Sequence, residues 1–457
     1  MRLALLLIAF AVAPVWVEAA AVEEISGTFD DGTHWLARKP ENWNGTLLLD
    51  LDGAGFLARS EGSASQAKPV RRPNPFDDWL FEQGYALGGT TREPVGYDFP
   101  KAVDHLLEVR RLFAEKWGVP KRTIASGGSR GAFVVRLSLE LYPGIFDGGI
   151  MYAGGGAGEI AVLNNKLHAL FVLKTLVDPD SPLTIVDVVD VEKEMRALNE
   201  LLAKATATPQ GRARLALAAA VQQFALWVSR GKPKPNPTDY EAQLDQIAEN
   251  FVFAMAIPVR AGVERVAGGN VSWNTDADYA QLLRRSGRTA MVEALYRKAG
   301  LSLEQDLRTL ATAPRIRANP GAVRRAEGML TYTGRIEDPL VNVDNDDPVD
   351  PASDKLAYIR TLQRAGRAHL FQLLWSDSAG HGGPTHLDRA VGFALLIRRL
   401  ETGSWGDTSL PALRMLATEI KRATTVDLGE TTLFDPGQLP EPASEWDVTH
   451  WGTYRWE

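Results

Sequence analysis

Short apolar segments alternate with turn residues through the first third of the chain, and helical patterns lie between them. The strand-like segments are rich in β-branched and aromatic residues and are bounded by Gly, Asp, Pro or Asn. A helix is predicted over residues 99–117, where apolar side chains recur at helical spacing. The predicted strands are residues 24–29, 34–37 and 46–51, which we interpret as a meander, followed by 85–91, 122–126 and 146–152.

The pattern changes between residues 158 and 328, where long helical repeats dominate, as over 191–205, 211–228 and 240–253. We interpret this stretch as a helical cap inserted into an α/β core. Alternation then returns, because strands are predicted over 329–333 and 369–375 and helices over 353–365 and 387–400. Strands and helices at these intervals favour a mostly parallel central sheet with helices on both faces.

The chain therefore divides into five predicted parts. Residues 22–157 and 329–401 form the two halves of the α/β core, and residues 158–328 form the cap between them. Residues 402–457 are interpreted as a C-terminal extension. Residues 1–21 have a different character and are treated separately.

The amino terminus has the features of a secretory signal peptide. Arg2 is followed by an apolar run over 3–17 and by small residues that end at Ala21, where we expect cleavage. The alternative is a retained amphipathic anchor. No later segment has an uninterrupted apolar run of membrane-spanning length. The sequence thus predicts a secreted or periplasmic protein without a membrane partner after cleavage.

Composition excludes several classes of function. The 457 residues carry a formal net charge of -7, so a nucleic-acid partner is not expected. The chain has no cysteine, which removes disulfides, thiol nucleophiles and Cys-ligated zinc. The remaining chemistry rests on hydroxyl, carboxylate and imidazole side chains, and the oligomeric state is left open.

One short motif carries a specific chemical prediction. Residues 127–131 read Gly-Gly-Ser-Arg-Gly, between a predicted strand and a predicted helix. A G-x-S-x-G turn in this context projects the serine hydroxyl above the edge of a sheet, and its glycines provide the room that the tight turn requires. Ser129 is therefore the candidate nucleophile. The alternative is an ordinary loop between a strand and a helix.

The segments around this motif resemble the cap-bearing α/β-hydrolases. The resemblance rests on residues 125–149, 331–341 and 379–383, and it extends over the predicted core from about 40 to 150 and from 329 to 401. It implies an α/β-hydrolase fold, in which the nucleophile, an acid and a histidine follow in that order along the chain.

The resemblance also implies which residues complete the site. Asp338 is the predicted acid that orients the base, with Glu337 and Asp344 as competitors. His381, in a glycine-flanked loop after a predicted strand, is the predicted general base. His386 is its nearest competitor, although it stands at the start of a helical pattern.

Two backbone N–H groups are needed to stabilise the oxyanion of the tetrahedral intermediate. The resemblance implies that they belong to Arg130 and Ala54, with Gly53 and Gly55 allowing the backbone to approach the substrate. The Arg130 side chain binds a substrate carboxylate or pairs with a structural acid. Trp273 lines the substrate site or serves in packing.

Residues 344–350 form a run dense in carboxylates, which could hold calcium. The run lacks the spacing of a twelve-residue calcium loop, so we interpret it as a solvated acidic loop. No metal ion is therefore assigned to the site.

Together these residues predict a serine hydrolase that cleaves a small carboxylic ester through an acyl-enzyme, without a metal or organic cofactor. The same triad could serve a peptidase, an amidase or an acyltransferase. A catalytically inactive binding protein is the alternative from another class.

Overall fold

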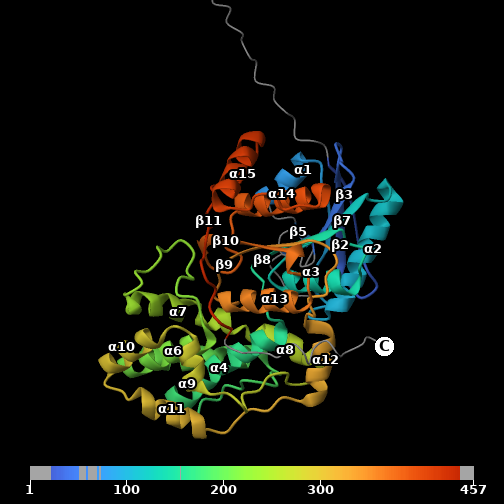
Figure 1. Ribbon diagram of the computed structural model, residues 1–457. Coiled ribbons are helices and arrows are strands. Elements are labelled where there is room, and N and C mark those ends of the chain that lie inside the picture. The colour runs from blue at the N-terminus through green and yellow to red at the C-terminus, as the bar shows by residue number, and fades with distance from the viewer. Residues whose placement is uncertain (1–21, 51–57, 60–68, 71–73, 155, 443–457) are drawn as a thin grey trace, which may run out of the picture.

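A computed structural model describes residues 22–50, 58–59, 69–70, 74–154 and 156–442 of the chain. Within these residues a nine-stranded sheet has the order β1-β2-β6-β3-β7-β8-β9-β10-β11 (Figure 1). The strands from β6 to β10 in this order are parallel, and β1, β2 and β11 are antiparallel to their neighbours. The strands are β1 (Val22–Thr28), β2 (His34–Pro40), β3 (Thr46–Asp50), β6 (Ala86–Thr90), β7 (Arg122–Gly128), β8 (Gly148–Tyr152), β9 (Leu340–Asp346), β10 (Phe371–Ala379) and β11 (Leu433–Phe434), with β4 (Ala58–Arg59) and β5 (Pro69–Val70) in a separate pair.

The predicted meander is wrong for its third strand. β6 lies between β2 and β3, and β3 runs parallel to both of its neighbours, β6 and β7. Leu47, Leu48 and Leu49 are all buried, so β3 has the continuous apolar character of an inner parallel strand. Proximity in sequence suggested a meander, whereas burial on both faces requires a central position.

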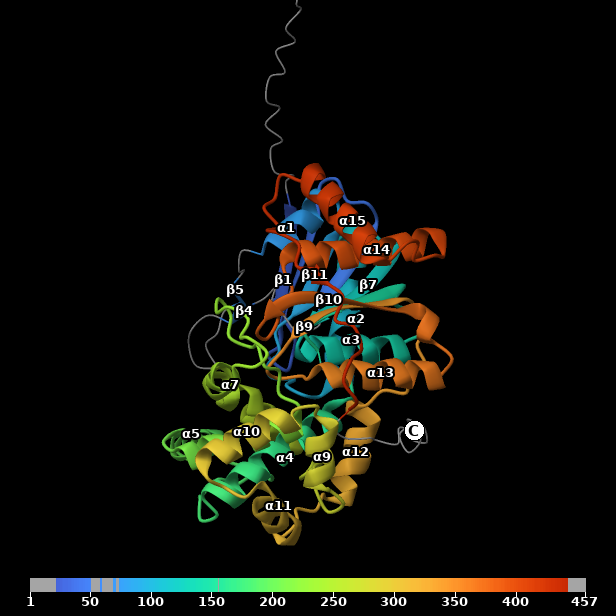
Figure 2. The same ribbon diagram turned by 60° about the vertical axis from the view of Figure 1, so that its left-hand side comes forward.

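Helices cover both faces of the sheet, as Figures 1 and 2 show. One apolar cluster joins the sheet to α1 (Pro75–Glu82), α14 (His386–Thr402) and α15 (Leu410–Ala423). A second cluster joins the opposite face to α2 (Phe99–Trp117), α3 (Arg130–Leu141) and α13 (Ala352–Arg364). Burial on two faces accounts for the apolar strands and confirms the predicted α/β-hydrolase fold class.

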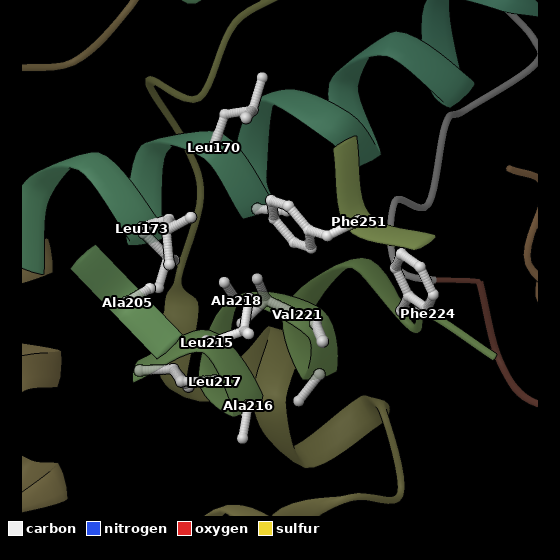
Figure 3. Close-up of a cluster of buried hydrophobic side chains, with 14 of the residues drawn as sticks. Leu170, Leu173, Ala205, Leu215, Ala216, Leu217, Ala218, Val221, Phe224 and Phe251 are labelled. Carbon is white, nitrogen blue, oxygen red and sulfur yellow. The ribbon is translucent and has the colours of Figure 1, made fainter. Parts of the chain in front are cut away.

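A helical layer lies beyond α3 and α13, on one side of the sheet (Figures 1 and 2). Its core gathers around α6, where small alanine side chains alternate with leucines and allow α4 to pack closely (Figure 3). The helices are α4 (Glu159–Val177), α5 (Val191–Thr206), α6 (Pro209–Gln222), α7 (Tyr240–Met255), α8 (Ile257–Ala267), α9 (Tyr279–Arg285), α10 (Thr289–Ala299), α11 (Leu303–Thr312) and α12 (Pro320–Leu330).

Among the helices of the described residues, α4 alone has the length and apolar composition to cross a membrane. Within its most apolar window, 83% of the residues are buried inside the protein. Its apolar run is interrupted by Asn164, Asn165 and Lys166. The packing therefore accounts for the apolar character of this helix.

Two predicted boundaries differ from the structure. The strand expected over 329–333 is wrong, because α12 continues to Leu330 and the next strand, β9, begins at Leu340. A short apolar run that ends a helix cannot be distinguished from a buried strand by periodicity alone. The expected C-terminal extension also joins the core, since β11 pairs with β10 and α15 packs against α14.

Candidate active site

Ser129 occupies the sharp turn between β7 and α3. Its backbone has φ 54° and ψ -122°, in a region that side chains rarely adopt. A Cβ atom on Gly127 would come within 2.7 Å of the Gly131 backbone, so the motif glycine provides the space for the turn. The Ser129 N–H donates a 3.0 Å hydrogen bond to the carbonyl of Tyr152. The strained turn predicted from the motif is therefore present.

The carboxyl ends of β7, β9 and β10 lie at the same edge of the sheet, because these strands belong to one parallel set. Ser129 directly follows β7, Asp347 directly follows β9, and His381 stands two residues after the end of β10. Side chains that are far apart in sequence meet at this edge.

His381 faces Ser129, as predicted. Its Nε2 atom lies 2.7 Å from Ser129 Oγ. The flanking residues Gly380 and Gly382 have positive φ angles of 91° and 71°, which turn the loop back over the sheet edge. The competing histidine, His386, is the first residue of α14.

The acid facing His381 is Asp347, so the prediction of Asp338 is wrong. Asp347 Oδ2 lies 2.8 Å from His381 Nδ1. Asp338 precedes β9 and therefore stands at the opposite end of that strand from His381. The two competitors weighed with it, Glu337 and Asp344, also fall outside the pair, because Glu337 precedes β9 and Asp344 lies within it.

The hydrogen bonds fix the direction of proton transfer. An ionised Asp347 can only accept, so His381 Nδ1 carries the proton and Nε2 accepts from the Ser129 hydroxyl. Burial opposes the charged form of Asp347, but the facing imidazole, together with Lys355 and the Val349 N–H, holds the pKa of the carboxyl below its ordinary value. Burial likewise opposes a charged His381, yet Asp347 raises the pKa of the imidazole above its ordinary value.

The acidic run at 344–350 is buried, so its interpretation as a solvated loop is wrong. Asp344, Asp347 and Asp350 are each at most 3% exposed. Lys355 lies 3.4 Å from Asp344 Oδ2 and donates a 3.0 Å hydrogen bond to the carbonyl of Asp350. Lys166 donates a 2.7 Å hydrogen bond to the carbonyl of Val349. Two buried lysines thus hold the loop that carries Asp347.

Asp347, Asp350 and His381 could each offer one ligand atom to a metal, since these atoms lie within 4.8 Å of one another. Asp347 and His381, however, are hydrogen-bonded to each other in line with Ser129. This arrangement is that of a nucleophile, a base and an orienting acid, and it accounts for the cluster without a calcium ion.

The helical layer also contacts the base. Arg230, in the segment after α6, donates a hydrogen bond to the carbonyl of His381. The Phe253 ring, at the end of α7, lies edge-on to the His381 ring at a centroid distance of 5.8 Å. The layer therefore contacts both loops that complete the site, through Lys166 on the acid side and Arg230 on the base side.

A cavity of about 410 Å³ opens beside Ser129 and His381. This volume suits one small organic molecule. Its apolar wall includes Tyr97, Phe133, Val162, Val252, Phe253 and Val259. Its charged residues are Arg92, Arg130, Glu159, Lys166 and Asp350.

Trp273 is absent from the wall of this cavity, so its expected role as lining is wrong. The residue is partly buried against the apolar core around α2 and α3, and its backbone N–H donates to Asn164 Oδ1 at 2.9 Å. Packing, the other role weighed for it, accounts for its position.

Arg130 is the first residue of α3, so its backbone N–H has no acceptor inside the helix. The guanidinium donates to the carbonyl of Gly96 and lies over the rings of Tyr97 and Phe99 at 5.8 and 5.3 Å. Ala54, Gly53 and Gly55 lie outside the described residues, as does the predicted signal peptide, so these calls stay predictions.

The parallel sheet, the serine turn and the order Ser, Asp, His place the chain among the α/β-hydrolase-type serine hydrolases. A model of the "Tannase-like family of unknown function (DUF6351)" matches residues 24–155. The chain is similar to an o-phthalyl amidase from Xanthobacter agilis, with 29% identity over 462 residues that cover 93% of this chain and 97% of the amidase.

Two solved structures are similar in outline. Feruloyl esterase B from Aspergillus oryzae has a TM-score of 0.41 and 12% identity, covering 87% of this chain and 85% of the esterase. An acylaminoacyl peptidase from Pyrococcus horikoshii has a TM-score of 0.39 and 10% identity over 87% of this chain, which spans only 44% of that peptidase. At TM-scores below 0.5, neither structure bears on the substrate of this chain.

Proposed function

We propose that the chain hydrolyses a small carboxylic ester or amide through an acyl-enzyme on Ser129. The observation that carries this proposal is the hydrogen-bonded series Ser129, His381 and Asp347, which opens into a cavity. His381 takes the hydroxyl proton as Ser129 Oγ attacks the substrate carbonyl, and it returns this proton to the leaving alcohol or amine. A water molecule, deprotonated by His381, then attacks the acyl carbon, and the acid leaves as Ser129 Oγ takes the proton back from His381.

Asp347 orients the imidazole and stabilises its charged form during both steps. The Arg130 N–H is the first oxyanion donor in this proposal, and Ala54 remains the proposed second donor. The steps proposed here use only groups of this chain and water.

We favour an aromatic acyl group, because Tyr97, Phe133 and Phe253 line the cavity. The sequence alone favoured esters. The similarity to an o-phthalyl amidase over 93% of the chain supports amides as equal candidates, whereas the tannase-like match covers residues 24–155.

The decisive experiment compares the wild type with Ser129→Ala and with a control, Ser138→Ala. Ser138 is a buried serine of α3 whose hydroxyl donates to the carbonyl of Val134 at 2.8 Å. A fluorophosphonate probe should label the wild type and Ser138→Ala but leave Ser129→Ala unlabelled. Turnover of para-nitrophenyl esters and para-nitroanilides of benzoic acids then measures the preference for esters or amides.

Three results would redirect the proposal. A folded wild type that takes no label and turns over no substrate favours the binding protein. Ester formation with an added alcohol, at the expense of hydrolysis, favours the acyltransferase. Release of amino acids from aminoacyl amides, with benzoyl derivatives untouched, favours the peptidase.

We also propose export, on the basis of the leader over residues 1–21. Amino-terminal sequencing of the protein recovered from a secreting host should begin at Val22. Recovery of an intact Met1 terminus in a membrane fraction favours the retained anchor instead.

A further inference from the structure

One face of α4 forms part of the cavity beside Ser129. Glu159, Val162 and Lys166 all line it, and their spacing of three and four residues places them on the same side of the helix. Glu159 is 2% exposed and Lys166 is 1% exposed. Two ionisable side chains are therefore buried in the wall of a cavity whose other lining residues are mostly apolar.

Glu159 has unused hydrogen-bonding capacity at this position. Its Oε2 atom is buried without a hydrogen-bond partner, which is costly for a carboxyl group unless a ligand supplies the partner. Lys166 donates one hydrogen bond, to the carbonyl of Val349, although an ammonium group has three protons to donate. Both side chains can therefore engage a bound molecule.

The charges around Glu159 come from four elements. Lys166 of α4, Arg130 of α3 and Arg92 in the segment after β6 are positive, and Asp350 in the loop after β9 is negative. Burial and Asp350 raise the pKa of Glu159 to about 8, against the opposing effect of the three cations. At neutral pH the Glu159 carboxyl therefore carries a proton that it can donate. Burial lowers the pKa of Lys166, and Asp350, Glu159, Asp354 and Asp347 oppose that effect, so a bound anion would further favour the charged ammonium group.

We propose that Lys166 and Glu159 bind a carboxylate carried on the acyl part of the substrate. The inference rests on the proposed function and makes it more specific: the substrate is a half-ester or half-amide of an aromatic dicarboxylic acid. Lys166 supplies the charge and one N–H, and Glu159 donates its O–H to the second oxygen of the carboxylate. Hydrolysis at Ser129 then releases the dicarboxylic acid and the alcohol or amine.

Matched substrates test this assignment. One series consists of the para-nitroanilides of benzoic, phthalic and isophthalic acid, and the other of the para-nitrophenyl esters of benzoic and isophthalic acid. Within each series the leaving group is the same, and the benzoyl member lacks the carboxylate that the other members carry. For the wild type, kcat/KM should be higher for at least one of the carboxylated substrates than for the benzoyl substrate with the same leaving group. A buried, charge-assisted hydrogen bond corresponds to a preference of about 10- to 100-fold.

Lys166→Met should abolish that preference. The variant also releases the Val349 carbonyl, which slows both substrates of a pair alike, so the ratio of the two kcat/KM values is the informative measurement. Lys174→Met is the matched control, because Lys174 lies on the same helix and also donates to a backbone carbonyl, that of Leu183. Lys174 is not among the residues that line the cavity, and its variant should keep the wild-type ratio.

The Glu159→Gln variant tests whether Glu159 must carry a proton in order to bind the substrate carboxylate. Glutamine keeps the size and the donor but cannot ionise. The wild-type preference for the carboxylated substrate should fall as the pH rises through about 8, because an ionised Glu159 repels the substrate carboxylate. In Glu159→Gln this fall should be absent, and the comparison with the wild type removes the contributions of the other titrating groups.

Separate results would overturn the two proposals. An equal ratio for carboxylated and benzoyl substrates in the wild type, or a preference that survives in Lys166→Met, excludes this carboxylate site while leaving hydrolysis at Ser129 intact. A pH dependence shared by the wild type and Glu159→Gln excludes the role of Glu159. Failure to turn over any of these substrates, together with absence of fluorophosphonate labelling, overturns the proposed function itself.

Discussion

Asp347 Oδ2 lies 2.8 Å from His381 Nδ1, whereas Asp338 lies before β9 and beside Asp147, where burial and that neighbour raise the pKa of Asp338 to about 6. Asp347→Asn should therefore lower kcat by about ten-thousandfold, as expected when a triad acid loses its charge. Asp338→Asn is the control and should change kcat less than about threefold, because it leaves the three hydrogen-bonded groups in place. Steady-state kinetics on any ester that is turned over decides between them, and a larger loss in Asp338→Asn would contradict the assignment.

The His381 pKa gives the acidic limb of the activity profile. His381 must be neutral to accept the Ser129 proton, and Asp347 raises its pKa above the ordinary value of 6.5. Activity should therefore fall with decreasing pH through a midpoint above 6.5, seen in kcat/KM of the wild type. In Asp347→Asn the burial and the smaller effect of Asp350 remain while the main raising charge is gone, so an NMR titration of the imidazole should give a lower pKa. A wild-type midpoint below 6.5 would contradict the prediction.

Phe253 should contribute to substrate binding more than to stability. Its ring lines the cavity and stands beside His381, yet the residue is 57% exposed. Phe253→Ala should raise KM for an aromatic acyl substrate by roughly fivefold, which corresponds to about 1 kcal/mol. The free energy of unfolding should change by less than about 0.5 kcal/mol.

The matched control for this variant is Phe434→Ala, since Phe434 is also exposed but lines a different cavity. Its KM should equal that of the wild type. A rise of the same size in both variants, or a loss of stability confined to Phe253→Ala, would assign Phe253 a packing role instead.

The two glycines before Ser129 should differ sharply in their tolerance of alanine. A Cβ on Gly127 would lie 2.7 Å from the Gly131 backbone, whereas a Cβ on Gly128 has its nearest neighbour at 3.6 Å. Gly127→Ala should cost about 1–3 kcal/mol in the free energy of unfolding and displace Ser129, with loss of labelling. Gly128→Ala should fold and label like the wild type. Chemical denaturation and probe labelling measure both effects, and equal behaviour of the two variants would count against the tight turn.

Ser129 and His381 could be predicted from the sequence, because both lie in glycine-marked turns next to recognisable strands. Asp347 could not, because its strand was missed. β9 reads Leu-Val-Asn-Val-Asp-Asn-Asp, and its polar residues suggest a solvated loop. In the structure, Lys355 and hydrogen bonds to neighbouring groups allow Asp344 and Asn345 to be fully buried. The strand could not be recognised because some of the groups that satisfy its polar side chains come from other segments of the chain.

The apolar wall of the cavity and the position of the charged residues of α4 could not be predicted from the sequence either. Glu159 and Lys166 lie in a helix whose composition indicates only a buried core. Their role depends on which face of the helix meets the sheet edge, and that orientation is set by tertiary packing. The helical character of the insertion, in contrast, can be predicted from the helical spacing of its apolar residues.

The bond from Lys166 to the acid loop and the bond from Arg230 to the base loop limit how this enzyme can be altered. A chimaera in which the whole segment from α4 to α12 is replaced by that of another hydrolase would gain a different helical layer. It would lose the two hydrogen bonds that help to hold the loops of Asp347 and His381 in position. Changes of selectivity in this protein are therefore better sought by point substitution within the existing segment than by exchanging it.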